Sequence, residues 1–170
     1  MLSRTFLWPQ GYTSAAMISV NLDAEFYGRI FYPGIDVSEG DIQRLGWTGM
    51  EYGLPHLLDC FREHGVKGTF FIPGRVAELY PDAVRAIADA GHELGCHGYE
   101  HEILAHFTPE EQLELLKKAK AAIEKAAGRA VTGFRMPEGE ITEQTLVAAK
   151  EAGFAYSSSL SNTCLLYTSD

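Results

Sequence analysis

The sequence has few cysteines, no long apolar run and little positive charge. Its 170 residues include three cysteines, Cys60, Cys96 and Cys164, and none of them has a CxxC spacing. An odd number without that spacing argues against a disulfide framework, so we interpret them as thiols in a reducing compartment. On an alternating strand Cys96 would face away from the neighbouring His97, which favours a packed thiol over a metal ligand.

The lack of long apolar runs and the negative net charge limit both the location and the partners that we expect for this protein. No stretch approaches the ~20 apolar residues that a membrane-spanning helix needs. The opening MLSRTFLWPQGY has a short apolar patch but no small-residue cleavage site after it, unlike a secretory leader. We therefore expect a cytoplasmic protein. The formal net charge of −9 disfavours nucleic acid and anionic membrane surfaces as partners.

The sequence instead alternates apolar, strand-like runs with amphipathic helical segments. Helix 108–128 is the clearest, because Thr108 fits the N-cap and Glu111 completes a capping box. Glycines end each predicted helix, which is their usual place. No linker or repeat interrupts the pattern, so we predict one domain over residues 1–163. The predicted strands are 15–23, 66–74, 92–98, 130–137 and 154–160, and the predicted helices are 53–65, 81–91, 108–128 and 142–153.

This alternation predicts an α/β fold with parallel strands joined by right-handed crossovers. Periodicity leaves open whether the strands form a doubly wound sheet or a barrel. In both, chemistry belongs at the carboxyl ends of the strands. Asp23, His97 and Arg135 each end a predicted strand, so we expect all three at the same rim.

Two histidines four residues apart, His97 and His101, are together with Asp23 a candidate metal site. One carboxylate and two imidazoles often hold a catalytic divalent cation and leave a position open for water. Each residue alone is more often a cap, a turn former or a surface residue. Their joint placement at the expected rim gives the metal site the same weight as these alternatives, and spacing alone leaves both open.

The runs AMISVNLDAE, GTFFIPG, GHELGCHGYEH and GFRMPEG resemble, in order and spacing, the polysaccharide deacetylase family (NodB homology, carbohydrate esterase 4). The branch with peptidoglycan-deacetylase-like and allantoinase-like members is the most similar. The resemblance extends from Trp8 to about Leu160. It implies a distorted (β/α) barrel, of which this chain would hold about five strands before truncation.

The resemblance also implies an activity and a set of site residues. The activity is hydrolysis of non-peptide C–N bonds, as in N-deacetylation of polysaccharide or peptidoglycan; the alternative is hydrolysis of small cyclic imides or ureides. A divalent metal is implied, with zinc expected and cobalt, manganese or iron as alternatives. The implied metal ligands are Asp23, His97 and His101, the arginine that orients the catalytic carboxylate is Arg135, and the substrate-binding positions are Asn21, Pro137, Glu138 and Gly139.

One departure from the family pattern concerns the catalytic base. Family members usually carry an aspartate where this chain has Asn21, and a carboxamide cannot accept a proton from water at neutral pH. Either Glu25 or Glu138 replaces the base, or the protein has altered or lost the deacetylase activity and binds a ligand without hydrolysing it. On a continued strand Glu25 would point to the same side as Asp23, so we predict a catalytic role for it.

Two further segments carry predictions. Residues 26–49 are expected to form a long aromatic and glycine-rich loop, in which Tyr27 and Trp47 either stack on a flat ring or a sugar face or cover the barrel's core. Residues 164–170, CLLYTSD, do not resemble the family and are expected to be a non-native tail. The family's later motifs, including the general acid, are missing, so we do not expect this chain alone to be active. We expect a small-molecule or glycan amide substrate and leave a homo-oligomer open.

Overall fold

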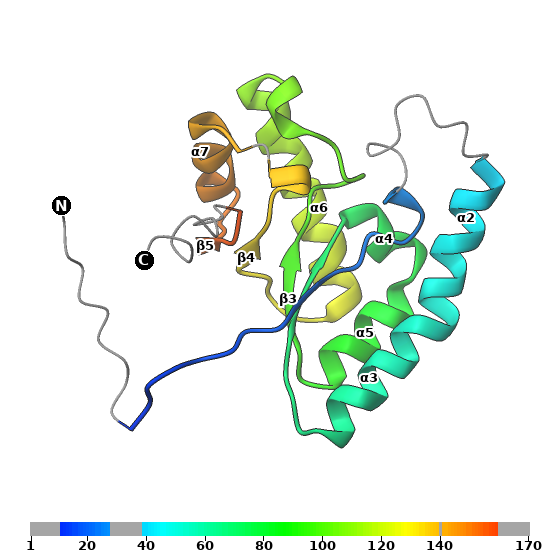
Figure 1. Cartoon of the computed structure of the whole chain (residues 1–170). Coiled ribbons are helices and arrows are strands. Elements are labelled where there is room, and N and C mark those ends of the chain that lie inside the picture. Colours follow the sequence, from blue (N-terminus) through cyan, green and yellow to red (C-terminus); the bar gives the residue numbers. More distant parts are fainter. Residues whose placement is uncertain (1–10, 28–38, 140, 160–170) are drawn as a thin grey trace, which may run out of the picture.

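The computed structural model describes residues 11–27, 39–139 and 141–159, and it confirms an α/β fold built on five parallel strands (Figure 1). Residues 164–170, and residues 28–38 of the predicted loop, lie outside the described residues. The strands are β1 (Ser19–Asn21), β2 (Thr69–Ile72), β3 (Glu93–Cys96), β4 (Gly133–Phe134) and β5 (Tyr156–Ser157).

The strand order favours the barrel over the doubly wound sheet. Each strand pairs in parallel with the next one along the chain, in the order β1-β2-β3-β4-β5. A doubly wound sheet reverses its order at a switch point, and helices then cover both faces. An unbroken order with right-handed crossovers places the helices on one face, as in the wall of a barrel.

The helices follow the predicted alternation and add two segments. None of those in the described part of the chain is long and apolar enough to cross a membrane. The predicted capping box of α6 is present, because Thr108 Oγ1 accepts from the Glu111 N–H and the Glu111 carboxylate accepts from the Thr108 N–H. The helices are α2 (Glu39–Thr48), α3 (Leu54–Glu63), α4 (Gly74–Leu79), α5 (Pro81–Asp89), α6 (Pro109–Ala127) and α7 (Glu143–Glu151), with short turns η1 (Ala24–Phe26), η2 (Gly49–Gly53), η3 (Leu104–His106) and η4 (Pro137–Gly139).

The prediction of a loop over residues 26–49 is wrong for residues 39–49, which form α2 and the start of η2. The glycines there favoured the loop interpretation, but Gly46 is a residue of helix α2 that allows a close backbone contact. A β-carbon on Gly46 would lie 2.7 Å from the carbonyl carbon of Ala24. Gly46 therefore lets α2 pack against the backbone of η1, directly after Asp23.

The two faces of the sheet differ in character. On one face Phe70, Ile72, Leu94, Cys96 and Phe134 are fully or almost fully buried in the hydrophobic core. Cys96 is thus a packed thiol, as predicted, and both cysteines of the described residues are free. This face anchors the strands whose carboxyl ends carry the candidate site.

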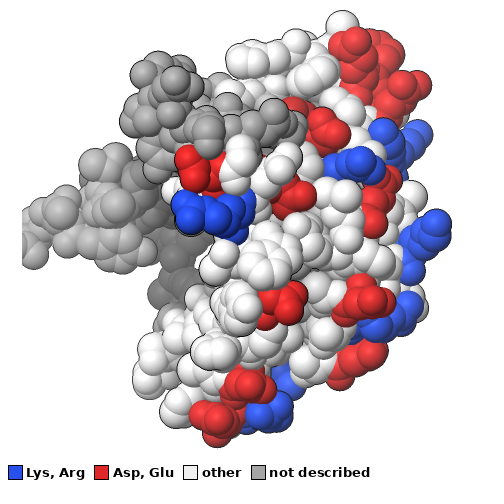
Figure 2. Space-filling view, turned by 90° about the vertical axis from the view of Figure 1, so that its right-hand side faces the viewer, with Lys and Arg blue, Asp and Glu red and all other residues white. Residues whose placement is uncertain are grey.

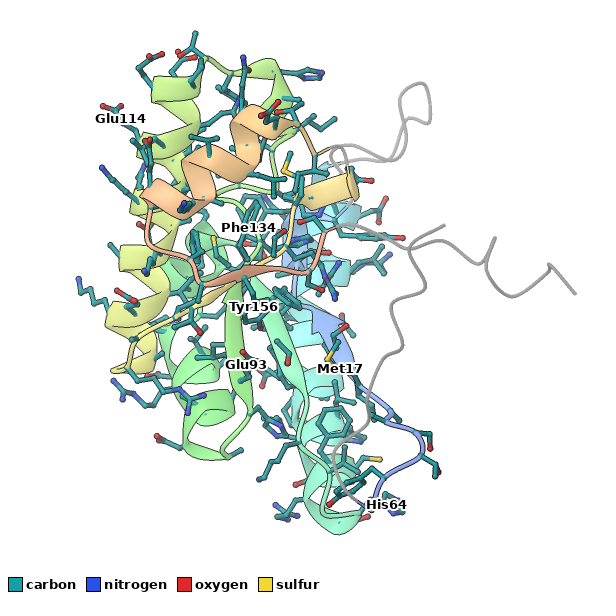
Figure 3. All side chains as sticks on the ribbon, turned by 90° about the vertical axis from the view of Figure 1, so that its left-hand side faces the viewer. Met17, His64, Glu93, Glu114, Phe134 and Tyr156 are labelled. Carbon is teal, nitrogen blue, oxygen red and sulfur yellow. The ribbon has the colours of Figure 1, made fainter. Side chains whose placement is uncertain are left out.

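On the opposite face, one row crosses the sheet from Phe71 through Gly95 and Gly133 to Tyr156. The Phe71 ring lies over Gly95, where a β-carbon would be 2.5 Å from it, and the Tyr156 ring lies over Gly133. Tyr156 also donates to Glu93 Oε1 at 2.7 Å (Figure 3). The glycines therefore make room for two aromatic rings on this face.

Charged groups of both signs cover the outer helices. Figure 2 shows acidic and basic side chains interspersed with uncharged ones, without a continuous basic patch on the face in view. Exposed ion pairs three residues apart join Arg44 to Asp41 and Arg62 to Asp59. Such exposed pairs contribute little to stability, so packing against the sheet holds the helices.

Packing at the start of α4 gives a first prediction. A β-carbon on Gly74 would lie 2.6 Å from Ala119 Cα and 2.8 Å from the Tyr99 ring. We expect Gly74→Ala to destabilise the fold by about 1–3 kcal/mol through overpacking, measured by urea unfolding. Gly49→Ala is the control, because no atom lies within 4 Å of its added carbon. Equal losses in the two variants would contradict the close α4–α6 packing.

A buried histidine gives a second prediction. His92 packs between Phe61 and Phe70, and its Nδ1 accepts from the Gly68 N–H at 3.1 Å. Burial, with Lys67 and Arg129 nearby, lowers the pKa of His92 below its ordinary 6.5. The unfolded chain therefore binds this proton more readily, and the stability from neutral His92 is lost as pH falls through about 6.5.

We expect the unfolding free energy of the wild-type chain, taken as its difference from that of His92→Gln, to fall as the pH drops from about 8 through about 6.5, because the difference removes the contributions of the other titrating groups. The control is His56→Gln, an exposed histidine of α3, which should keep the wild-type pH dependence. An identical pH dependence in all three proteins would show that His92 does not titrate differently on folding.

Candidate metal centre

The carboxyl ends of the strands surround a pocket of about 370 Å³. Asp23, His97 and Arg135, the three residues predicted to meet at one rim, all line it. The full lining is Asn21, Asp23, Tyr27, His97, His101, Arg135, Met136, Glu138, Gly139, Ser158 and Ser159.

Asp23, His97 and His101 form a compact cluster at the floor of this pocket. One ligand atom from each lies within 4.8 Å of the others. His97 Nε2 is 3.7 Å from Asp23 Oδ1, and His101 Nε2 is 3.8 Å from Asp23 Oδ2. These separations are too long for hydrogen bonds, so the three groups face one another without direct bonding.

The backbone fixes which nitrogen of His97 faces the cluster. His97 Nδ1 lies 2.8 Å from the Arg135 carbonyl oxygen, which can only accept a hydrogen bond. In neutral imidazole Nδ1 therefore carries the proton, and the lone pair is on Nε2, beside Asp23. A carbonyl partner of this kind commonly orients a metal-binding histidine.

Burial shapes the charge of the cluster. Asp23, His97 and His101 are 8%, 1% and 3% exposed. Burial lowers the pKa of His97 to about 4, helped by the neighbouring His101 and Arg135 and opposed by the bond to the Arg135 carbonyl. Burial also lowers the pKa of His101. The imidazoles are therefore neutral at physiological pH, which is the form that binds metals.

Burial also makes the Asp23 carboxylate harder to ionise. Burial raises the pKa of Asp23 to about 7, and the Glu138 carboxylate adds repulsion. Asp23 Oδ1 and His97 Nε2 are buried without a hydrogen-bond partner among the described residues. Unpaired buried polar atoms are rare and costly, and two neutral imidazoles with one carboxylate suit Zn²⁺. The three residues present therefore fit a divalent cation.

The loop after β3 positions His101. Gly98 and His101 both have positive φ, +74° and +62°. The Glu102 carboxylate accepts from the backbone N–H groups of Tyr99 and Glu100 and closes the loop. We predicted no role for Glu102, and its spacing after His97 carries no clear signal of one.

Arg135 forms the opposite wall of the pocket. Its guanidinium stacks on the Phe71 ring, 4.1 Å from the centroid. Nη1 donates to Asn21 Oδ1 at 2.9 Å, and Nη2 donates to Ser158 Oγ at 2.7 Å. The arginine thus orients the carboxamide of Asn21.

The structure brings together some of the other predicted residues. Glu138 lies in the pocket with φ +58°, and its Oε1 is 3.8 Å from His101 Nδ1. Gly139 also lines the pocket, whereas Pro137 is buried beside Gly98, behind it. Tyr27 lines the pocket and is half exposed.

Glu25 and Trp47 lie away from the pocket lining. The premise for Glu25 is wrong, because β1 ends at Asn21 and the chain turns into η1 at Ala24 instead of continuing as a strand. Glu25 accepts from the Tyr80 hydroxyl at 3.3 Å. Trp47 lies on α2 in edge contact with Tyr52.

Sequence reasoning missed Ser158 and Ser159. Both line the pocket, and Ser159 Oγ accepts from the Met136 N–H at 2.8 Å. They follow directly after β5, so the rule that chemistry lies at the carboxyl ends of strands would have found them.

Comparisons with known proteins agree with this geometry. The family model described as polysaccharide deacetylase matches residues 47–157. A peptidoglycan deacetylase of Helicobacter pylori is 36% identical over 129 residues, which is 76% of this chain and 43% of that protein. The chain thus spans less than half the length of this curated relative.

Solved structures are similar as well. One from Mycobacterium smegmatis, assigned to the polysaccharide deacetylases, has a TM-score of 0.81 and 34% identity, covering 91% of this chain and 54% of that one. A CE4 family pseudoenzyme from Bacillus anthracis has a TM-score of 0.61 and 30% identity, covering 64% of this chain and 38% of that one. A mutant of that pseudoenzyme, with a TM-score of 0.61 and 31% identity over 64% of this chain and 40% of the mutant's, is described as having restored enzymatic activity.

The cluster gives a third prediction. We expect the chain to bind one Zn²⁺, and His97→Ala to weaken binding by more than the ~10–100-fold that outer-shell changes cost. Isothermal titration of metal-free protein measures this. His106→Ala is the control, since this exposed histidine of η3 is not part of the cluster. Unchanged affinity in His97→Ala would exclude His97 as a ligand.

Proposed function

The chain belongs to the polysaccharide deacetylase family, and we propose that it supplies the metal-binding part of a hydrolase that cleaves the amide C–N bond of an N-acylated glycan. The observation that carries this proposal is the buried Asp23–His97–His101 cluster at the floor of an open pocket. Among the described residues, Asp23 Oδ1 and His97 Nε2 are buried without a hydrogen-bond partner, and both imidazoles are in the neutral form that binds a cation.

Asp23, His97 and His101 would hold the metal. A divalent cation bound there would polarise an amide carbonyl and lower the pKa of water toward neutrality. The Arg135 carbonyl keeps His97 in the tautomer that ligation needs. The open pocket above the cluster gives an acyl group access to it.

The substrate class rests on the relatives. The H. pylori protein is named a peptidoglycan deacetylase, which supports an N-acetylated glycan over a small cyclic imide or ureide. A glycan also suits the pocket, which is open at the rim and has the half-exposed ring of Tyr27 on its wall. An aromatic ring can stack on the apolar face of a sugar.

The proton acceptor is the weak point of the site. Arg135 holds a carboxamide, Asn21, where it would hold a carboxylate in a typical family member. Of the two glutamates considered as replacements, Glu138 lies in the pocket and Glu25 does not. We therefore assign the residual base role to Glu138, at a cost in rate.

A second function has specific support: a catalytically silent member that binds its ligand in the same pocket. Asn21 lies in the orientation set by Arg135 yet cannot accept a proton. The similarity to a CE4 family pseudoenzyme also supports this alternative. Both functions predict the same metal site and differ in turnover.

The fourth prediction separates them. In the protein that contains this chain, loaded with Zn²⁺, Asn21→Asp places a carboxylate beside Arg135 at the cluster. We expect acetate release from N-acetylglucosamine oligomers to rise by about 10²-fold or more, the usual contribution of a general base. Asn21→Ala is the control and should not gain activity.

Slow wild-type turnover that Glu138→Gln abolishes would support the hydrolase with Glu138 as its base. No wild-type turnover, with activity in Asn21→Asp alone, would favour the silent member. If Zn²⁺ binds and neither protein releases acetate, the deacetylase proposal is wrong.

A further inference from the structure

The orientation of the Asn21 carboxamide is chemically determined. Arg135 Nη1 lies 2.9 Å from Asn21 Oδ1, and a guanidinium has donors but no acceptor. The atom facing Arg135 must therefore be the carbonyl oxygen, although oxygen and nitrogen of an amide are often hard to tell apart. Both hydrogens of Asn21 Nδ2 remain for other partners, and no described residue accepts them.

Arg135 is itself held in place on three sides. Its plane stacks on Phe71, and Nη2 donates to Ser158 Oγ. The Ser158 N–H in turn donates to the Phe134 carbonyl at 2.8 Å, which fixes the serine relative to β4. Burial lowers the pKa of Arg135, but arginine titrates so far above neutrality that the group stays charged.

This anchoring reverses the usual polarity of the position. A carboxylate held by Arg135 would present a second oxygen, which accepts hydrogen bonds. The carboxamide presents N–H donors instead, and the Arg135 charge withdraws electron density from it through the carbonyl. Asn21 and Ser158 both line the pocket that contains the metal cluster, so the donors lie where a ligand of that cluster would bind.

We propose that Asn21 is a hydrogen-bond donor to the acyl oxygen of the bound ligand, either the glycan amide or the carboxylate released from it. Ser158 is a positioning residue that keeps Arg135, and hence the Asn21 amide, in this orientation. The inference rests on the proposed function for the identity of the ligand. The site thereby favours holding an acyl group over activating water.

The chain allows a direct test, because Asn21 and Asn162 are its two asparagines. Selective ¹⁵N labelling of asparagine gives two pairs of side-chain amide signals, and their assignment follows from the pair lost in Asn21→Asp. We expect sodium acetate to move the Asn21 amide protons downfield, in Zn²⁺-loaded protein and, at higher concentration, in metal-free protein.

Variants measure the strength of this interaction. We expect Asn21→Ala to weaken acetate binding to the Zn²⁺-loaded chain by about tenfold, as for loss of a bond to a charged group. Ser158→Ala should weaken it less and broaden the Asn21 signal. Ser19→Ala is the matched control, because Ser19 lies on β1 outside the pocket lining and should leave acetate affinity unchanged.

Asn21→Asp should then change two measurements in opposite directions. It should weaken the binding of free acetate, and it should raise the rate at which N-acetylglucosamine oligomers are hydrolysed. An Asn21 signal that does not respond to acetate, or wild-type acetate affinity in Asn21→Ala, would overturn the donor role. So would an equal loss of Zn²⁺ and acetate affinity in Asn21→Ala, since the residue would then support the cluster itself. Failure of Zn²⁺ to bind the wild-type chain would contradict the proposed function, while the metal-free acetate titration would still decide the role of Asn21.

Discussion

The peptide of Arg135 connects the two halves of the site. Its N–H donates to the Cys96 carbonyl at the end of β3, and its carbonyl accepts from His97 Nδ1. One residue of β4's end thus fixes the ring of His97 through its backbone and the amide of Asn21 through its side chain. The metal cluster and the opposite wall cannot shift independently, because both are attached to the same short segment.

The energetics of the cluster explain why it needs this rigidity. Burial makes the imidazoles neutral and makes the Asp23 carboxylate hard to ionise. Among the described residues, neither Asp23 Oδ1 nor His97 Nε2 has a hydrogen-bond partner, so these polar atoms are mismatched without a cation. The unpaired polar atoms therefore lower the free energy of unfolding. A cation that binds only the folded state would raise it again.

The sequence was sufficient where a general rule connects position to geometry. The carboxyl-end rule brought Asp23, His97 and Arg135 to one rim, and the capping pattern placed the start of α6 at Thr108. The sequence was insufficient where the role of a residue depends on a contact with a residue far away in the chain. Gly46 looked like a loop residue, because only the fold brings the backbone of Ala24 against it.

The same limit applies to the acids around the site. Glu25 was assigned by extending β1, and its true direction depends on the turn that follows Asp23. Glu102 and Ser158 act through hydrogen bonds to a loop and to Arg135, which no local pattern encodes. Strand register and loop closure, which decide such contacts, arise from the packing of the whole sheet.

The row of aromatic rings over glycines has a consequence for the tolerance of this protein to change. Arg135 rests on Phe71, and Phe71 lies flat because Gly95 has no side chain beneath it. A single methyl group added at residue 95 would tilt that ring and lift the guanidinium, although it would touch no ligand and no pocket atom. A substitution at Gly95 would therefore alter the position of Arg135 through the Phe71 ring, without any direct contact between residue 95 and the site.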